Sequence, residues 1–141
     1  MIAKGLLATA VAVTIVGSAP IANSEPAPAG SETLSPLLQQ ALPNVAGKTF
    51  TSAIVTFPPG AHAAPHRHGD AFVYAYVLEG AVSSQLEGEP GHVYRKGENW
   101  SEQPGAHHVA TENVSSTDPA KLLVVFIATT GEQLKVDDPQ G

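Results

Sequence analysis

The segment Gly60-Ala61-His62-Ala63-Ala64-Pro65-His66-Arg67-His68 holds three of the six histidines in this chain of 141 residues. His66 and His68 are one residue apart. Side chains alternate between the two faces of a strand, so this spacing predicts two imidazoles on the same side. A second pair, His107 and His108, follows a Pro-Gly turn. Neutral imidazole is the commonest metal ligand, and the chain has no cysteine to compete for that role. The two segments therefore outline a metal site.

Beyond Pro43 the sequence predicts an all-β domain. Runs rich in β-branched or aromatic residues are expected to form strands, and Gly, Pro or Asn separates neighbouring runs. The runs cover residues 49–57, 71–78, 81–86, 92–94, 99–102, 107–112 and 121–130. Many short strands joined by regular turns are typical of an antiparallel sandwich or barrel. Residues 35–42 instead predict a short N-terminal helix, with a serine N-cap, proline at the first helical position and leucines on one face.

The first 24 residues have the pattern of an export signal. Lys4 supplies the positive charge, an apolar run extends from Gly5 to Gly17, and small residues lead to Ser24, after which cleavage is expected. The run is shorter than the about 20 apolar residues that span a bilayer. The sequence therefore predicts a secreted or periplasmic protein with no stable membrane association after cleavage. An uncleaved N-terminal anchor is the alternative.

The rest of the chain is long enough for one compact domain and too short for two. We expect a signal peptide at 1–24, a linker and short helix at 25–43, the folded domain at 44–134 and a tail at 135–141. Loss of Lys4 leaves 6 basic against 13 acidic side chains, a net charge of −7. This charge disfavours nucleic acid and anionic lipid. The expected partner is a small-molecule substrate or ligand, and a homodimer is left open.

Two motifs between Gly60 and Asn113 resemble those of the cupin family, whose members are small jelly-roll barrels. The first is a glycine, five residues, His-x-His and a later glycine. The second has a glycine, a proline-glycine turn, a histidine and an asparagine; here Gln103 replaces the proline and Asn113 lies next to the asparagine position. The matching residues are Gly60, His66, His68 and Gly80 in the first motif, and Gly97, Gly105 and His108 in the second. The resemblance implies a single cupin barrel.

The family's first motif also contains a glutamate, and at that position this chain has Val73. The resemblance therefore implies a histidine-only site, as in a subset of the family, or a site that has lost its metal. Neutral ligands leave the full charge of a divalent ion in the cavity, with coordination positions open. Fe(II) is the favoured ion, and Zn, Mn, Ni and Cu are alternatives. The implied ligands are His66, His68 and His108, beside an apolar wall of Val73, Ala75 and Val77.

Other polar residues close to the motifs are candidates for a role in the site. Glu102 and His62 are the candidate catalytic groups, because each is placed near a ligand and can carry a proton. An occasional ligand is the alternative role for Glu102, and it is one of the roles left open for Asp70; the role of Trp100 is also left open. His107 is expected to point away from the barrel, because neighbours on a strand face opposite sides.

The resemblance implies two classes of function. The first is an exported mononuclear metal dioxygenase, in which the ion binds O₂ and a small organic substrate, with redox-neutral isomerisation or hydrolysis on the same ion as an alternative. The second is a cupin that binds a metal or small ligand without turnover. The fold alone does not decide between them, because one fold hosts many functions.

Overall fold

The strand β10 (Ala120–Thr129) shows why this sequence folds as a barrel. Its side chains alternate between buried and half-buried, the pattern of a strand with one face on a core. It pairs antiparallel with β2 (Lys48–Phe57) on one side and with β5 (Phe72–Glu79) on the other. The buried residues of β10 are Ala120, Leu122, Val124, Phe126 and Ala128. The structure is a computed structural model, and it describes residues 30–140.

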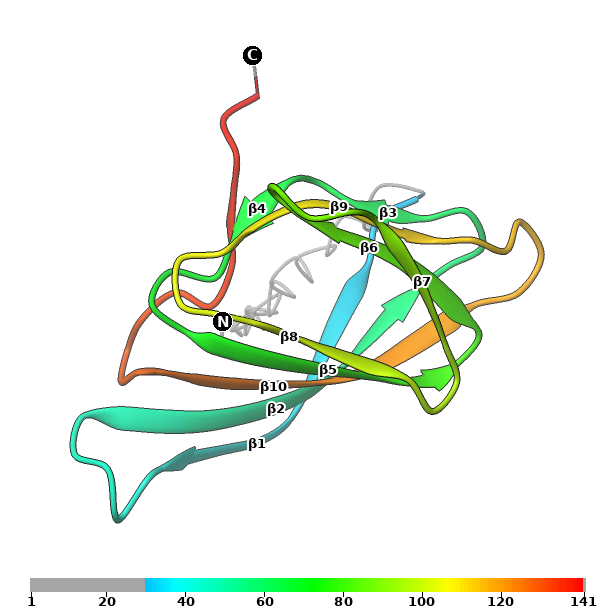
Figure 1. The fold of residues 1–141 in the computed structure, drawn as a ribbon. Coiled ribbons are helices and arrows are strands. Elements are labelled where there is room, and N and C mark those ends of the chain that lie inside the picture. Colours follow the sequence, from blue (N-terminus) through cyan, green and yellow to red (C-terminus); the bar gives the residue numbers. More distant parts are fainter. Residues whose placement is uncertain (1–29, 141) are drawn as a thin grey trace, which may run out of the picture.

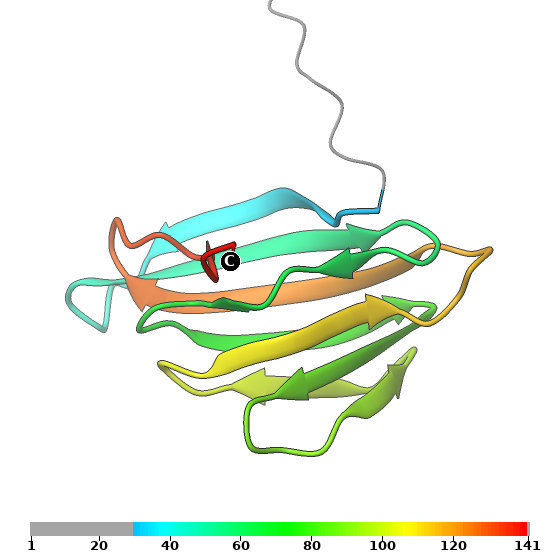
Figure 2. The ribbon, with the colours of Figure 1, turned by 90° about the horizontal axis from the view of Figure 1, so that it is seen from above.

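Two antiparallel sheets face each other around the core (Figure 1). The first has the order β1 (Thr33–Ala41), β2, β10, β5 and β8 (Asn99–Glu102), and these strands lie side by side when seen from above (Figure 2). The second has the order β11 (Val136–Asp137), β4 (His66–Arg67), β9 (His107–Asn113), β6 (Ala81–Leu86) and β7 (His92–Arg95). A two-residue strand, β3 (His62–Ala63), also pairs with β9.

This arrangement confirms the predicted all-β jelly roll. Each of the runs predicted as strands is a strand, with both ends within one residue of the predicted ones. The chain also passes repeatedly from one sheet to the other, so strands distant in sequence become neighbours. Residues 30–140 contain no helix, and therefore none that could cross a membrane.

The predicted short helix at residues 35–42 is wrong, because this segment forms the edge strand β1. Its backbone pairs along its length with β2, and this long-range pairing outweighs the local helical signals. Pro36 lies where the register shifts, between Pro36 and Leu38, and an edge strand with a bulge tolerates a residue without an N–H group. The predicted signal peptide and most of the predicted linker, at residues 1–29, lie outside the described residues.

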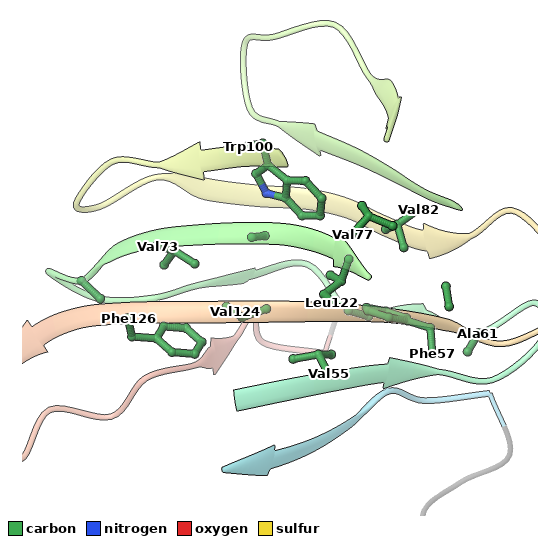
Figure 3. Close-up of a cluster of buried hydrophobic side chains, with 14 of the residues drawn as sticks. Val55, Phe57, Ala61, Val73, Val77, Val82, Trp100, Leu122, Val124 and Phe126 are labelled. Carbon is green, nitrogen blue, oxygen red and sulfur yellow. The ribbon is translucent and has the colours of Figure 1, made fainter. Parts of the chain in front are cut away.

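The core lies between the sheets and consists of aliphatic and aromatic side chains. Figure 3 shows Val73, Trp100, Val124 and Phe126 along β5, β8 and β10. On β5 the buried residues are Val73, Ala75 and Val77, as predicted for the inner face. At the end of β5, Gly80 has a φ of 75°, and a Cβ there would lie 2.9 Å from the carbonyl oxygen of Pro119. The tight corner between β5 and β6 therefore requires glycine.

Candidate metal centre

Three histidines from two neighbouring strands meet inside the barrel. His66 on β4 and His108 on β9 are directly opposite each other in the antiparallel ladder, and their ring centroids are 5.0 Å apart. His68, which follows β4, has its ring centroid 4.8 Å from that of His66. One ring nitrogen from each of the three lies within 4.8 Å of the others. The structure thus brings together the three histidines that the sequence predicted as ligands.

Backbone carbonyl groups orient two of these rings. Nδ1 of His66 lies 2.7 Å from the carbonyl oxygen of Ala64, and Nδ1 of His68 lies 2.6 Å from that of Leu134. A carbonyl oxygen only accepts, so Nδ1 must donate in both rings. When the imidazoles are neutral, Nε2 of each carries a lone pair. Histidines that bind metals usually donate their other ring N–H group in this way.

His108 is held by two hydroxyl groups instead. Its Nε2 lies 2.7 Å from Oγ of Ser84 and 2.7 Å from Oγ1 of Thr111. Its Nδ1 lies 3.1 Å from Oε1 of Glu102. The sequence predicted convergence of the Nε2 atoms of all three histidines within about 3 to 4 Å. In the structure Nε2 of His108 is engaged by the hydroxyls, and the nitrogen that an ion would bind, in place of its hydrogen bond to Glu102, is Nδ1.

Burial keeps His66 and His68 neutral. Desolvation lowers the pKa of His66 from 6.5 to about 4, despite its hydrogen bond to Ala64. Desolvation also lowers the pKa of His68, although the Glu102 carboxylate opposes this shift. Only 5% of His66 is exposed. A neutral imidazole offers the lone pair that coordination requires, so both rings are ready to bind an ion at pH 7.

Glu102 on β8 lies in the same buried region, with 3% of the residue exposed. Its Oε1 accepts a hydrogen bond of 3.1 Å from Nε1 of Trp100, and its Oε2 lies 3.5 Å from Nε2 of His68. Burial would raise the pKa of Glu102, but the hydrogen bond with His108 and the electrostatic influence of His108 and His68 hold it below the usual value. The side chain is therefore a carboxylate.

A cavity of about 150 Å³ extends from the three histidines and Glu102 into the apolar core. Most of its wall is aliphatic or aromatic. The apolar residues that line it are Leu34, Val55, Phe57, Ala63, Val73, Ala75, Trp100, Leu122, Val124, Phe126 and Leu134. The cavity is thus apolar along most of its wall, with polar side chains at the histidine end and at its mouth, a common form for a small-molecule site.

Comparison with known proteins now identifies the family. The model of the cupin domain matches residues 53–126, which is more than half of the chain. The chain belongs to the cupin family. A search of curated proteins gives no match.

Solved structures with the same fold support this assignment. A DMSP lyase, DddQ from Ruegeria pomeroyi, is 22% identical with a TM-score of 0.61 over 75% of this chain and 51% of the lyase. Oxalate oxidase in complex with the substrate analogue glycolate is 22% identical with a TM-score of 0.56 over 76% and 57%. A protein from Thermus thermophilus is 26% identical with a TM-score of 0.55 over 68% and 82%. This cupin spans about half the length of the lyase.

The cavity mouth of this cupin is crossed by an ion pair that the sequence did not predict. Nζ of Lys135 lies 2.6 Å from Oε1 of Glu32 and 2.8 Å from Oδ1 of Asp137. Burial would lower the pKa of Lys135, but these carboxylates raise it above its usual value, so Lys135 is a cation. Glu32 and Lys135 line the cavity, and they also line an outer hollow together with Gly30, Ser31, His62, Ala64 and Asp137. The ion pair therefore stands between the cavity and that hollow.

Of the other candidate residues, His62, His107 and Asp70 lie apart from the three histidines. His62 is exposed and lines the outer hollow, not the cavity. His107 points away, as predicted, and its Nε2 lies 2.7 Å from Oδ2 of Asp138. Asp70 is exposed and pairs with Lys48 at 3.2 Å. Trp100 does line the cavity, where it donates its hydrogen bond to Glu102.

Ser84 and Thr111 belong to the candidate site, and sequence reasoning missed both. Both are buried and directly opposite each other on β6 and β9. Polar residues on the inner face of a predicted strand were the available signal, since a buried hydroxyl needs a partner. In this cupin that partner is His108.

The donor set of this cupin fits a divalent metal ion. Three imidazoles converge, two of them with their remaining N–H groups fixed by carbonyl oxygens. Oε2 of Glu102 is buried and has no hydrogen-bond partner among residues 30–140. A buried anionic oxygen without a donor is costly, and a cation bound beside it would remove that cost. Imidazole and carboxylate together suit Zn, Mn and Fe(II).

Proposed function

We propose that this chain is an exported, metal-dependent cupin enzyme that acts on a small organic substrate. The observation that carries the proposal is the position of the three histidines at one end of a largely apolar cavity. A site that only stores a metal does not require an apolar cavity beside the ion. The open positions of an ion held by His66, His68 and His108 would face this space.

The volume and lining of the cavity favour a small and mostly apolar substrate. Its volume is about 150 Å³, a size at which an apolar cavity can hold a molecule such as benzene. Val73 and Ala75 on β5 and Val124 on β10 give one wall without a polar side-chain atom. A polar group of the substrate would then be directed to the histidine end, because only that end and the mouth carry polar side chains.

Dioxygenase chemistry with Fe(II) is the reaction we favour. When bound, the ion would supply Lewis acidity and the capacity to bind O₂. The chain supplies the remaining functions. The apolar wall excludes water and positions the substrate, and the neutral state of His66 and His68 leaves the positive charge of the site available to an anionic group. His62, in the outer hollow, is the candidate for exchanging protons with solvent.

Oxygen uptake tests the proposed chemistry. Protein purified without metal is loaded with Fe(II), and O₂ consumption is followed with small diketones, thiols and flavonols; the His66→Ala variant is the control. Uptake that requires both Fe(II) and His66 supports the proposal. Product formation without uptake, or with Zn(II) alone, would assign a redox-neutral reaction instead. Tight binding of a compound without conversion would make the chain a binding protein.

The proposed export is tested separately. Expression of the full chain in a bacterium, followed by intact-mass measurement of the periplasmic fraction, should give a protein that begins at Glu25. Full-length chain in the membrane fraction would instead show that the N-terminal segment anchors the protein.

A further inference from the structure

Glu102 is a buried carboxylate with one satisfied and one unsatisfied oxygen. Oε1 accepts a hydrogen bond of 3.1 Å from Nε1 of Trp100, whereas Oε2 is buried and has no hydrogen-bond partner among the described residues. Nε2 of His68 lies 3.5 Å from Oε2. Because 97% of Glu102 is shielded from solvent, bulk water does not compensate this oxygen.

The ring nitrogen of His68 that faces Oε2 cannot donate a hydrogen bond to it. Nδ1 of His68 donates to the carbonyl oxygen of Leu134, at 2.6 Å, so Nε2 of the neutral ring has only a lone pair. Two acceptors, a carboxylate oxygen and an imidazole nitrogen, therefore face each other across 3.5 Å. Two lone pairs directed at the same point favour a cation between them.

The distances around Glu102 are those of two ligands of one ion. Ligands about 2.1 Å from an ion are about 3.0 Å apart at a right angle and about 3.4 Å apart at the tetrahedral angle. Oε1 of Glu102 lies 3.1 Å from Nδ1 of His108, and Oε2 lies 3.5 Å from Nε2 of His68. The carboxylate thus contacts two of the three histidines at coordination spacing.

The sheet register explains how a residue on β8 reaches this position. Val73 on β5 and Glu102 on β8 are directly opposite each other in the antiparallel ladder, and both line the cavity. Side chains of such a pair have their Cβ atoms about 5 Å apart on the same face. A carboxylate at either position would therefore enter the same part of the cavity.

We propose that Glu102 is a fourth protein ligand of the metal ion, contributed by β8 opposite Val73. The site then consists of three neutral imidazoles and one carboxylate, and a divalent ion in it has a net charge of +1. Trp100 is a positioning residue, because its indole N–H group holds Oε1. This inference rests on the proposed metal site and assigns Glu102 the role of a ligand rather than that of a proton carrier.

Metal binding by Glu102→Gln tests the proposal. Zn(II) and Co(II) affinities of metal-free protein are measured by competition with a chelator, and the Co(II) absorption spectrum reports the coordination number. Glu79→Gln is the matched control, because Glu79 is an exposed carboxylate paired with Lys121. We expect Glu102→Gln to weaken binding by more than ~100-fold, beyond the 10–100-fold loss typical of residues that only orient a ligand. The Co(II) spectrum should also change.

A second variant tests the same claim by moving the carboxylate across the strand pair. The double change Val73→Glu and Glu102→Val keeps the same two residue types in the cavity and returns a carboxylate from β5. We expect it to bind at least ~10-fold more tightly than Glu102→Val alone, and circular dichroism establishes that each variant is folded. If the double variant does not fold, the comparison of metal affinity between the wild type and Glu102→Gln still decides whether Glu102 is a ligand.

The outcomes separate this inference from the metal site itself. If the wild type binds Co(II) and Glu102→Gln binds it within 100-fold with the same spectrum, Glu102 is not a ligand, and the three-histidine site stands. If the wild type binds neither ion while remaining folded, the metal site and this inference both fail. A large loss in Glu102→Gln without any gain in a folded double variant would reject the shared position opposite Val73.

Discussion

Ser84 on β6 and Thr111 on β9 are directly opposite each other, and both hydroxyls lie 2.7 Å from Nε2 of His108. A cross-strand pair thus fixes the ring of a candidate ligand from two sides. Because each hydroxyl can donate or accept, the pair can hold the ring in either neutral tautomer. The orientation of His108 therefore depends on the register between β6 and β9.

The first prediction concerns this pair. Ser84→Ala should weaken Zn(II) binding by about 10-fold, because His108 loses one of two groups that orient it. Ser83→Ala, one residue away on the same strand and only half-buried, is the control and should leave the affinity unchanged. Chelator competition measures both. Equal affinities for the two variants would show that Ser84 does not position a ligand.

The second prediction separates the ligand histidines from the others. His66→Ala should reduce Zn(II) affinity by more than ~100-fold, because it removes a ligand and not merely a group that orients one. His107→Ala and His62→Ala should retain affinity within about twofold, since neither residue lines the cavity. Calorimetric titration of the three variants distinguishes them. A large loss of Zn(II) affinity in His107→Ala would show that the face of β9 carrying His107, and not the face carrying His108, points into the barrel.

The strands and the histidine cluster were predictable because both depend on local patterns. The alternation of β10 and β5 is a period of two that the sequence displays directly, and the His-x-His spacing places two rings on one side. The helix predicted at residues 35–42 was wrong because its signals were also local, while β1 is stabilised by pairing with β2. A local pattern does not reveal a distant partner.

The polar surroundings of the histidines could not be predicted for the same reason. That Glu102 lies opposite Val73 and that Ser84 lies opposite Thr111 are facts of strand register. Register between strands distant in sequence is set by the closed barrel, and a shift of one residue would turn each of these side chains to the outer face. The ion pair of Lys135 and Glu32 joins residues 103 apart in the sequence.

The third prediction follows from the low pKa of His66. Burial lowers this pKa from 6.5 to about 4, so below pH 6.5 the unfolded chain takes up a proton that the folded metal-free protein binds only near pH 4. Stability attributable to His66 is therefore complete above pH 6.5 and lost as the pH falls toward 4. Between pH 7 and pH 5 the loss should be about 2 kcal/mol.

Urea unfolding of the metal-free protein at pH 7 and pH 5 measures this loss. His66→Gln, which does not titrate, should show a difference between the two pH values that is smaller by about 2 kcal/mol. The pKa of His68 is also lowered, so the stability of His66→Gln should still depend on pH to some extent. An identical pH dependence in wild type and His66→Gln would mean that His66 is protonated in the folded protein at pH 5.

The last prediction concerns the cavity. Ala75 on β5 is 2% exposed, lines the cavity and is opposite Val124 of β10. Ala75→Leu should place its added carbon atoms in the space of about 150 Å³ and exclude a small apolar ligand without touching the histidines. Fluorobenzene, followed by fluorine NMR, should bind the wild type and lose at least 10-fold in affinity in this variant, while Zn(II) affinity stays within about twofold. Ala110→Leu makes the same change at an exposed position and is the control. Fluorobenzene binding that survives Ala75→Leu unchanged would show that apolar ligands bind outside the barrel, and the cavity would lose its place in the proposed function.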